Sequence, residues 1–116
     1  MITIEKAADN LVKVKVPKHL VSGDFKAIEP TVDRLIQEHG KIRLLLDARE
    51  FDGWQNVDAA KEHFRFVKTH QHNIERAALI AGHQWQHWVG AIAETFLEPA
   101  VHVFDDPDAA LAWVKQ

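Results

Sequence analysis

The sequence predicts an α/β protein whose central sheet is mostly parallel. One observation is the apolar run at residues 42–46, which lies between charged residues and has the length of a buried strand. A strand that is apolar on successive positions is usually covered on both faces, as in a parallel sheet flanked by helices. The other is that strand-like runs alternate with helix-like periods along the chain, which indicates parallel strands joined by helices. We expect the order β-β-α-β-α-β-α-β-α.

The first two strands are expected at residues 2–5 and 11–16, where side chains alternate with a period of two. In the second run Val12, Val14 and Val16 face one way. The turn-like residues 8–10 connect the runs, so they should pair as an antiparallel hairpin. Pro17 lacks a backbone N–H and should end the ladder.

A first helix is expected after Ser22-Gly23-Asp24, with Ser22 or Asp24 as its cap. Helical spacing then relates Phe25, Ile28, Val32, Leu35 and Ile36. Pro30 lies inside this pattern and marks either a kink or a second start. Gly40 suits the helix C-terminus, just before the central strand.

A second helix is expected from about Asn56 to His70. Its apolar stripe is expected to contain Val57, Ala60, Phe64 and Val67. A basic stripe with i, i+4, i+7 spacing lies on an adjoining face and consists of Lys61, Arg65 and Lys68.

The remaining elements are a strand at residues 77–82, a helix from near Gln84 that Pro99 closes, a strand at residues 101–104 and a last helix. The helix after Gln84 carries apolar residues at regular helical spacing, among them Trp85, Trp88 and Ile92. Residues 105–108, Asp-Asp-Pro-Asp, should cap the last helix, with Pro107 in its first turn. That helix should bury Ala109, Leu111 or Ala112, Trp113 and Val114.

Composition restricts the possible functions. The 116 residues fit one domain spanning 1–116, with 47% hydrophobic and 27% charged residues. A net charge of −3 argues against a nucleic-acid partner. The absence of cysteine excludes disulfides and fits a reducing compartment. The N-terminus lacks a signal-peptide pattern, and we expect a cytoplasmic protein, with a peripheral location at the inner membrane as an extension of that expectation.

Three motifs in order resemble the SpoIIAA-like family of small bacterial proteins within the STAS superfamily. They are IRLLLDAREFDGW, IERAALIAGHQWQHW and VHVFDDPDAALAWV. The resemblance covers almost the whole chain. It implies a STAS-like, five-stranded mixed sheet with an N-terminal hairpin and four helices, related in shape to lipid-carrying CRAL-TRIO domains. It also implies no enzymatic activity, and it suggests membrane association or an apolar ligand under mobile helices.

One departure from the STAS pattern concerns phosphorylation. Anti-sigma-factor antagonists of this group carry a phosphorylatable serine just after the central strand. Here residues 47–54 read DAREFDGW and contain no hydroxyl, and the single serine, Ser22, lies elsewhere. A serine switch of the sporulation type is therefore not expected.

Aromatic residues after the central strand suggest a pocket, because sites in open α/β sheets form beyond the carboxyl ends of the strands. Phe64 and Phe66 are about 200° apart on an ideal helix, at ~100° per residue, so both cannot face the sheet. We expect the two helices after the central strand to form a lid over an apolar or lipid-like ligand. The expected lining residues are Phe51, Trp54, Phe64, Trp85, Trp88 and Ile92. Packing in an ordinary core is the competing interpretation.

The basic stripe predicts a second surface. Together with Phe66, the side chains of Lys61, Arg65 and Lys68 could contact anionic lipid headgroups, at about 1 kcal/mol per basic residue. A solvated helix face is the competing interpretation. A regulatory protein-protein interaction module, which would use the helical face on a partner or as a homodimer, is the alternative function.

Catalytic and metal sites receive little support from the sequence. Asp47, Glu50 and Asp52 lie at the expected site end, but such residues commonly cap a helix or pair with a neighbour such as Arg49. His83 and His87 have i, i+4 spacing, yet a third ligand would have to come from His63, His70 or Asp52. We therefore expect no catalytic residues, no metal and no cofactor.

Overall fold

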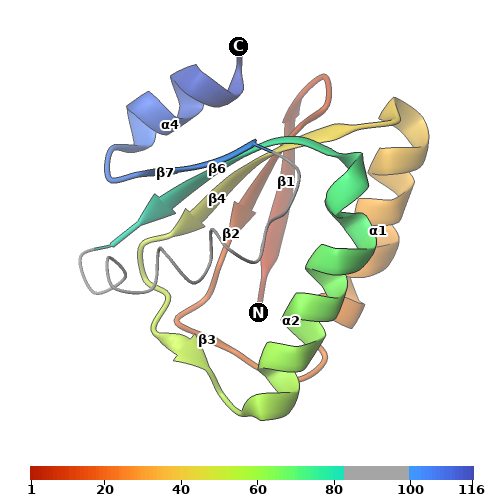
Figure 1. Ribbon diagram of the computed structural model, residues 1–116, viewed down its shortest axis with the longest axis vertical. Coiled ribbons are helices and arrows are strands. Elements are labelled where there is room, and N and C mark those ends of the chain that lie inside the picture. The colour runs from red at the N-terminus through yellow and green to blue at the C-terminus, as the bar shows by residue number, and fades with distance from the viewer. Residues whose placement is uncertain (83–99) are drawn as a thin grey trace.

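A computed structural model describes residues 1–82 and 100–116 and contains a five-stranded sheet in the order β1-β2-β4-β6-β7 (Figure 1). The strands are β1 (Thr3–Ala8), β2 (Leu11–Lys15), β4 (Ile42–Ala48), β6 (Ile74–Ala81) and β7 (Ala100–Phe104). β1 and β2 are antiparallel, and all other neighbours in this sheet are parallel. The expected mixed, mostly parallel sheet with an N-terminal hairpin is confirmed.

The hairpin has the expected turn. Ile4 is opposite Val14, and the chain reverses at Asp9, whose φ of 51° is of the kind that Asp adopts more readily than most residues. The ladder of β2 ends at Lys15, and Pro17 follows without a donor. The N–H of Val16 still donates to the carbonyl oxygen of Asp47 at 2.9 Å, which holds β2 against the end of β4.

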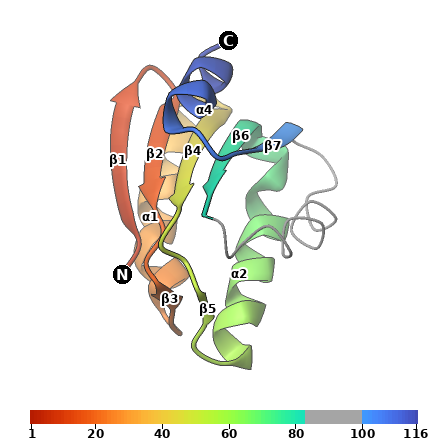
Figure 2. The same cartoon turned by 90° about the vertical axis from the view of Figure 1, so that its left-hand side faces the viewer.

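Helices cover both faces of the sheet. α1 (Asp24–His39) and α2 (Val57–His70) lie on one face, and α4 (Pro107–Val114) lies on the other (Figures 1 and 2). A short 3-10 helix, η1 (Gln71–Asn73), follows α2. The part of the chain with described coordinates thus has three α-helices. The fourth expected helix, from near Gln84 to Pro99, lies outside the described residues.

The start of α1 differs from the expected cap. Gly23, with a left-handed φ of 92°, occupies the cap position, and Asp24 is already the first helical residue. Its carboxylate accepts instead from the N–H of Val21 at 2.9 Å. The cap N–H itself donates to Glu62 of α2 at 2.9 Å, so a tertiary contact replaces the local one. The end of α1 at Gly40 is confirmed, with a φ of 79°.

The core has two layers because the sheet is covered twice. Beneath α1 and α2 lie Phe25, Val32 and Leu35 of α1, with Phe51 from the segment after β4. On the other face Ala110 and Val114 of α4 pack against Leu11 and Leu45 among others. Pro30 stays inside one continuous helix, α1.

The last helix begins where it was expected, but a different face of it is buried. Asp106 caps α4 and accepts from the N–H of Asp108 at 3.2 Å, and Pro107 fills the first turn. Ala110 and Val114 are fully buried, whereas Ala109 and Ala112 are exposed. The expected burial of Ala109 is wrong because the face one residue further along the helix meets the sheet.

A second, two-stranded parallel sheet was not expected. β3 (His19–Leu20) pairs with β5 (Gly53–Trp54), near the carboxyl ends of β2 and β4 (Figure 2). The Asp52 N–H donates to the Lys18 carbonyl at 2.7 Å, and the Gln55 N–H donates to the Leu20 carbonyl at 2.8 Å. These bonds fix the segment between β4 and α2 in place.

A helix that crosses a bilayer needs about 20 predominantly apolar residues. None of the helices within residues 1–82 and 100–116 combines the necessary length with the necessary apolar character.

Candidate functional site

A small hollow lies at the carboxyl ends of the central strands, where the topology predicts a site. Its volume is about 100 Å³, and its lining consists of Lys15, Val16, Asp47, Arg49 and Glu50. Lys15 and Asp47 are paired at the ends of the neighbouring parallel strands β2 and β4. Arg49 and Glu50 follow in the segment that β5 ties down.

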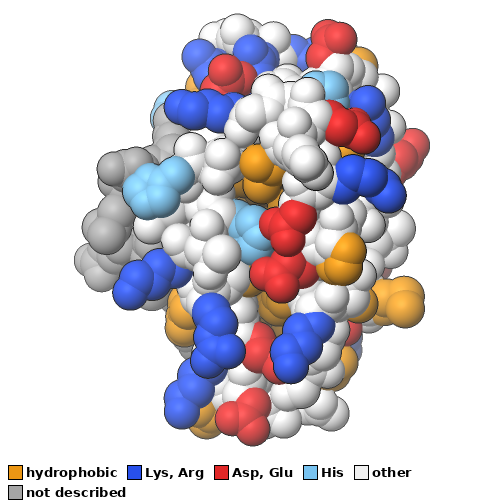
Figure 3. Space-filling view, turned by 90° about the vertical axis from the view of Figure 1, so that its right-hand side faces the viewer, with side chains coloured by type: hydrophobic (Ala, Val, Ile, Leu, Met, Phe, Trp, Pro, Cys, Tyr) orange, Lys and Arg blue, Asp and Glu red, His pale blue; other side chains and the backbone are white. Residues whose placement is uncertain are grey.

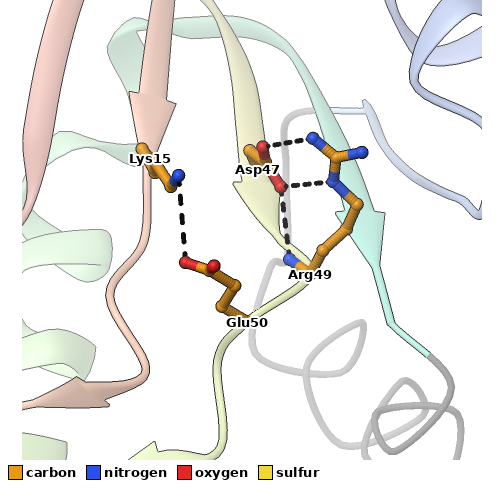
Figure 4. A network of polar contacts seen from close by, with 4 residues as sticks. All are labelled: Lys15, Asp47, Arg49 and Glu50. Carbon is orange, nitrogen blue, oxygen red and sulfur yellow. Dashed lines mark hydrogen bonds and ion pairs between the residues drawn. The ribbon is translucent and has the colours of Figure 1, made fainter.

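The charges around this hollow neutralise one another (Figure 4). Arg49 donates to Asp47 through Nε at 2.9 Å and through Nη2 at 2.8 Å. Lys15 Nζ lies 3.8 Å from Glu50 Oε2. The hydrogen bond from Arg49 holds the pKa of Asp47 below its ordinary value, so this carboxyl is ionised at neutral pH. The expectation that an acidic residue here pairs with Arg49 is confirmed.

The size of the hollow restricts what it can hold. Pockets for small organic ligands typically measure roughly 300 to 1,000 Å³, and this hollow is about 100 Å³. It suits a few water molecules or a single side chain of a partner. It does not provide a cavity for a lipid-like ligand.

An aromatic cluster lies beside the hollow, between β5 and α2. Phe51 is 3% exposed and packs edge-on against Trp54, with ring centroids 5.4 Å apart. Trp54 is half-buried and donates from Nε1 to Nδ1 of His63 at 3.1 Å. The ring of His63 stacks on Phe25 at 4.8 Å and is nearly parallel to it.

His63 is held as a neutral ring in this cluster. Burial lowers its pKa to about 4, because an imidazolium would lose its hydration there. Since Nδ1 accepts the hydrogen bond from Trp54, the single ring hydrogen lies on Nε2. His63 therefore serves as a flat, neutral core residue with one directional bond, and that bond holds α2 to β5.

The buried face of α2 differs from the expected apolar stripe. The residues turned toward the core are Ala59, His63, Phe66 and His70, at i, i+4, i+7 and i+11. Val57 and Phe64, which were expected on the core stripe, are 67% and 45% exposed. The expected stripe was wrong because it was drawn through hydrophobic residues only, whereas His63 and His70 occupy inward-facing positions of α2.

The prediction that Phe64 and Phe66 face different surroundings is confirmed. Phe66 packs against both core clusters under α1 and α2, with its ring 5.2 Å from Phe25 and 4.3 Å from His70. Phe64 is the exposed member, and its ring reaches back to Trp54 at 6.0 Å. Phe66 was expected at a membrane-facing surface, but its ring faces inward. Phe64 was expected to line a pocket, but its ring faces outward.

The other predicted site residues have these positions. Phe51 and Trp54 lie in the aromatic cluster, as described above. Lys61, Arg65 and Lys68 are exposed on the outer surface of α2. Trp85, Trp88 and Ile92 lie outside the described residues, and so do His83 and His87.

The fold and the comparisons agree on the family. The model of the family described as SpoIIAA-like matches residues 11–115, which is most of the chain. The chain belongs to the SpoIIAA-like family. Its motifs around the central strand, β6 and α4 all fall within the matched range.

Two solved structures are similar to this SpoIIAA-like chain. One is an uncharacterized DUF3478-family protein with a SpoIIAA-like fold from Shewanella loihica PV-4, with a TM-score of 0.80, 25% identity, and coverage of 98% of this chain and 92% of the other. The other is the anti-sigma factor antagonist SpoIIAA in its unphosphorylated form, with a TM-score of 0.62, 11% identity, and coverage of 99% and 98%. The second likeness shows the fold alone. The comparison with curated proteins finds no match.

Sequence reasoning missed one part of the hollow. Lys15 was not among the predicted site residues, although it is paired in register with Asp47 across two parallel strands. The sequence did carry a signal for this pairing, because Lys15 and Asp47 are each a charged residue near the end of a strand. The order of strands was needed to place the two side by side.

Proposed function

We propose that this SpoIIAA-like protein is a non-enzymatic protein-interaction module, which binds an acidic surface of a partner protein through the outer face of α2. The observation that carries the proposal is the exposed ring of Phe64, which lies among basic side chains on a helix whose opposite face is firmly packed. We name as the α2 face the residues Val57, Lys61, Phe64, Arg65 and Lys68.

Helix geometry puts these residues together. Val57, Lys61, Phe64 and Lys68 follow one another at i, i+4, i+7 and i+11, so they form a single outward stripe, with Arg65 beside it. Arg and aromatic residues that lie together on a surface are the types enriched in the energetic centres of protein interfaces. The stripe is held rigidly, because the Trp54–His63 bond and the Glu62–Gly23 bond attach α2 to its neighbours.

Charge complementarity gives the chemistry of the partner. Three basic residues surround one large apolar side chain, so the matching surface is acidic with a hydrophobic recess. A bilayer is the weaker match. Phe64 and Val57 provide the large apolar side chains of the stripe, and two such residues give little apolar area for insertion into a bilayer.

The described part of the chain favours this function over an apolar carrier. Phe51 and Trp54, two of the expected lining residues, pack against each other and against the core. The hollow nearby is lined mainly by charged residues and measures about 100 Å³. Arg49 lowers the pKa of Asp47 and donates to both of its oxygens, so Asp47 is a weak base, which supports a binding role over an acid-base one.

The proposed interaction does not depend on serine phosphorylation after the central strand. Residues 47–54 contain no hydroxyl, and Ser22 precedes α1 at an exposed position. Arg49, Glu50 and Lys15 instead give this end of the molecule fixed charges. Binding should therefore be governed by the availability of the partner.

The test begins with the capture of binding partners from extracts of the source cells. The affinity of a purified candidate partner is then measured by calorimetry. Phe64→Ser and Arg65→Glu should each weaken binding to the purified partner by roughly 10-fold or more, as central interface residues do. Arg34→Glu, an exposed change on α1, is the matched control and should leave the affinity unchanged.

Two outcomes would contradict the proposal. One is a purified partner that binds Phe64→Ser as tightly as the unaltered protein. The other is binding to anionic vesicles with the same dependence on Phe64 and Arg65 while purified proteins show none, which would favour the membrane surface.

A further inference from the structure

A buried histidine at the junction of α1 and α2 has no part in the proposed interaction. The side chain of His70 is 7% exposed, and its ring reaches two carboxylates of α1. Nε2 lies 2.8 Å from Oδ1 of Asp33 and 3.8 Å from Oε2 of Glu29. Figure 3, which looks onto the face covered by α1 and α2, shows acidic side chains beside a histidine at its centre.

The other ring nitrogen fixes the hydrogen positions. Nδ1 of His70 lies 2.7 Å from the carbonyl oxygen of Phe66, one turn earlier on α2. A carbonyl oxygen can only accept, so Nδ1 carries a hydrogen and donates it. Nε2 is thereby the nitrogen available toward Asp33 and Glu29. An imidazole that donates one N–H to a backbone carbonyl and presents the other nitrogen is the usual arrangement of a metal-bound histidine.

Nε2 and the two carboxylates need a positive charge between them, which either a proton or a metal ion can supply. An ionised carboxylate has lone pairs only, and so does Nε2 in the neutral tautomer that carries its hydrogen on Nδ1. At 2.8 Å two lone pairs would repel each other. A proton on Nε2 would make a hydrogen bond to Asp33, but one N–H can point at one oxygen only, so Glu29 at 3.8 Å would remain without a hydrogen bond to the ring. A metal ion would satisfy all three groups.

The distances suit a metal ion. The three donor atoms of Glu29, Asp33 and His70 all lie within 4.8 Å of one another. Tetrahedral coordination with bonds of about 2.0 to 2.1 Å requires donor atoms about 3.4 Å apart. The observed 2.8 and 3.8 Å fall on either side of that value, so small rotations of two exposed acidic side chains would complete the geometry.

We infer that Glu29, Asp33 and His70 form a binding site for a divalent metal ion of the Zn²⁺ type, which joins α1 to α2. One imidazole with two carboxylates favours a first-row transition ion, because Mg²⁺ and Ca²⁺ take oxygen ligands. Glu29 and Asp33 are 43% and 60% exposed in their side chains, so the remaining coordination position faces solvent.

The sequence carries a partial signal for this site. Glu29 and Asp33 have i, i+4 spacing on α1, which puts both carboxylates on one helix face. His70 is 37 residues after Asp33, and only the packing of α2 beside α1 brings it within reach. The site is separate from the α2 face, since His70 belongs to the buried side of the same helix.

The experiment is titration of the metal-free full chain with ZnCl₂ at pH 7.5, followed by calorimetry and by the ring nitrogen signals of His70 in NMR. His83→Asn and His87→Asn are present throughout, so that this i, i+4 pair cannot take up zinc. We expect one zinc ion per chain, a shifted Nε2 signal of His70 and a raised thermal unfolding midpoint. Excess MgCl₂ should not displace the zinc.

Exposed carboxylates make the decisive variants, because the buried His70 could be needed for folding. Asp33→Asn and Glu29→Gln should each weaken zinc binding by roughly 10-fold or more. Glu38→Gln is the matched control: it removes a carboxylate of another histidine pair on α1, with His39 at 3.9 Å, and should change nothing. Zinc binding that is equally tight in Asp33→Asn, or no uptake at about 100 µM zinc, would overturn the inference and leave a protonated ion pair.

Discussion

The stability of the protein should fall between neutral and mildly acidic pH because of His63. Burial lowers the pKa of this ring from 6.5 to about 4 in the folded chain. The unfolded chain therefore takes up a proton near pH 6.5, whereas the folded chain resists it until about pH 4. The contribution of His63 to the free energy of unfolding is fully present above pH 6.5 and is lost as the pH falls from 6.5 toward 4.

The magnitude follows from the difference between the two pKa values. Each pKa unit corresponds to about 1.4 kcal/mol, so His63 contributes at most about 3 to 4 kcal/mol to the loss. The bond from Trp54 Nε1 to His63 Nδ1 at 3.1 Å should stay intact across this window, because the folded ring stays neutral down to about pH 4. Set against a typical unfolding free energy of 5–15 kcal/mol, the effect is large enough to measure.

The assay is urea unfolding followed by circular dichroism at several pH values from 7.5 to 4.5. His63→Gln should be less stable at pH 7.5 and should lose much less stability on acidification than the unaltered protein. His72→Gln, at an exposed position after α2, is the control and should keep the full pH dependence. Equal slopes for the unaltered protein and His63→Gln would refute the reasoning. Measurements stop at pH 4.5, because Asp47 and Glu75, whose pKa values are lowered by Arg49 and Arg43, lose their contributions as the pH falls further.

Three further predictions concern local packing and charge. Phe66→Ala should lower the free energy of unfolding by about 2 kcal/mol, whereas Phe64→Ala should change it by less than about 0.5 kcal/mol, as equilibrium urea unfolding would show. Arg49→Ala should raise the pKa of Asp47 toward its ordinary value, so an NMR titration of that carboxyl should move upward, and an unmoved titration would contradict the bonded pair. Gly82→Ala should cost about 1 to 3 kcal/mol in the same unfolding assay, since its Cβ would lie 2.7 Å from the carbonyl oxygen of Arg49.

Much of the fold could be predicted because local signals and the global fold agree. Alternation of side chains located the hairpin, and the apolar run at 42–46 located β4, which extends to Ala48. Asp106 and Pro107 started α4 as their chemistry requires. The two-residue strands β3 and β5 were not predicted, because so short a pairing leaves no period in the sequence and forms only where the main sheet brings its partners together.

The candidate site depended more on tertiary structure. The sequence put the expected site end at residues 47–54 and indicated that an acidic residue there either caps a helix or pairs with a neighbour such as Arg49, because both follow from a strand end and a nearby charge. The sequence could not decide which side of α2 is buried. Apolar residues on both sides of that helix left the choice to packing, and the contacts of His63 with Trp54 and Phe25 decided it.

By itself, the sequence determined the five strands of the main sheet, the hairpin, the helix ends at Gly40 and Asp106, and the family, since each depends on residues close together in the chain. Only the tertiary structure decided that Phe64 faces outward and that His70 meets Glu29 and Asp33. The physical reason is distance along the chain: contacts between α1 and α2 form over more than 30 residues, and their energies, not local preference, set the rotation of each helix.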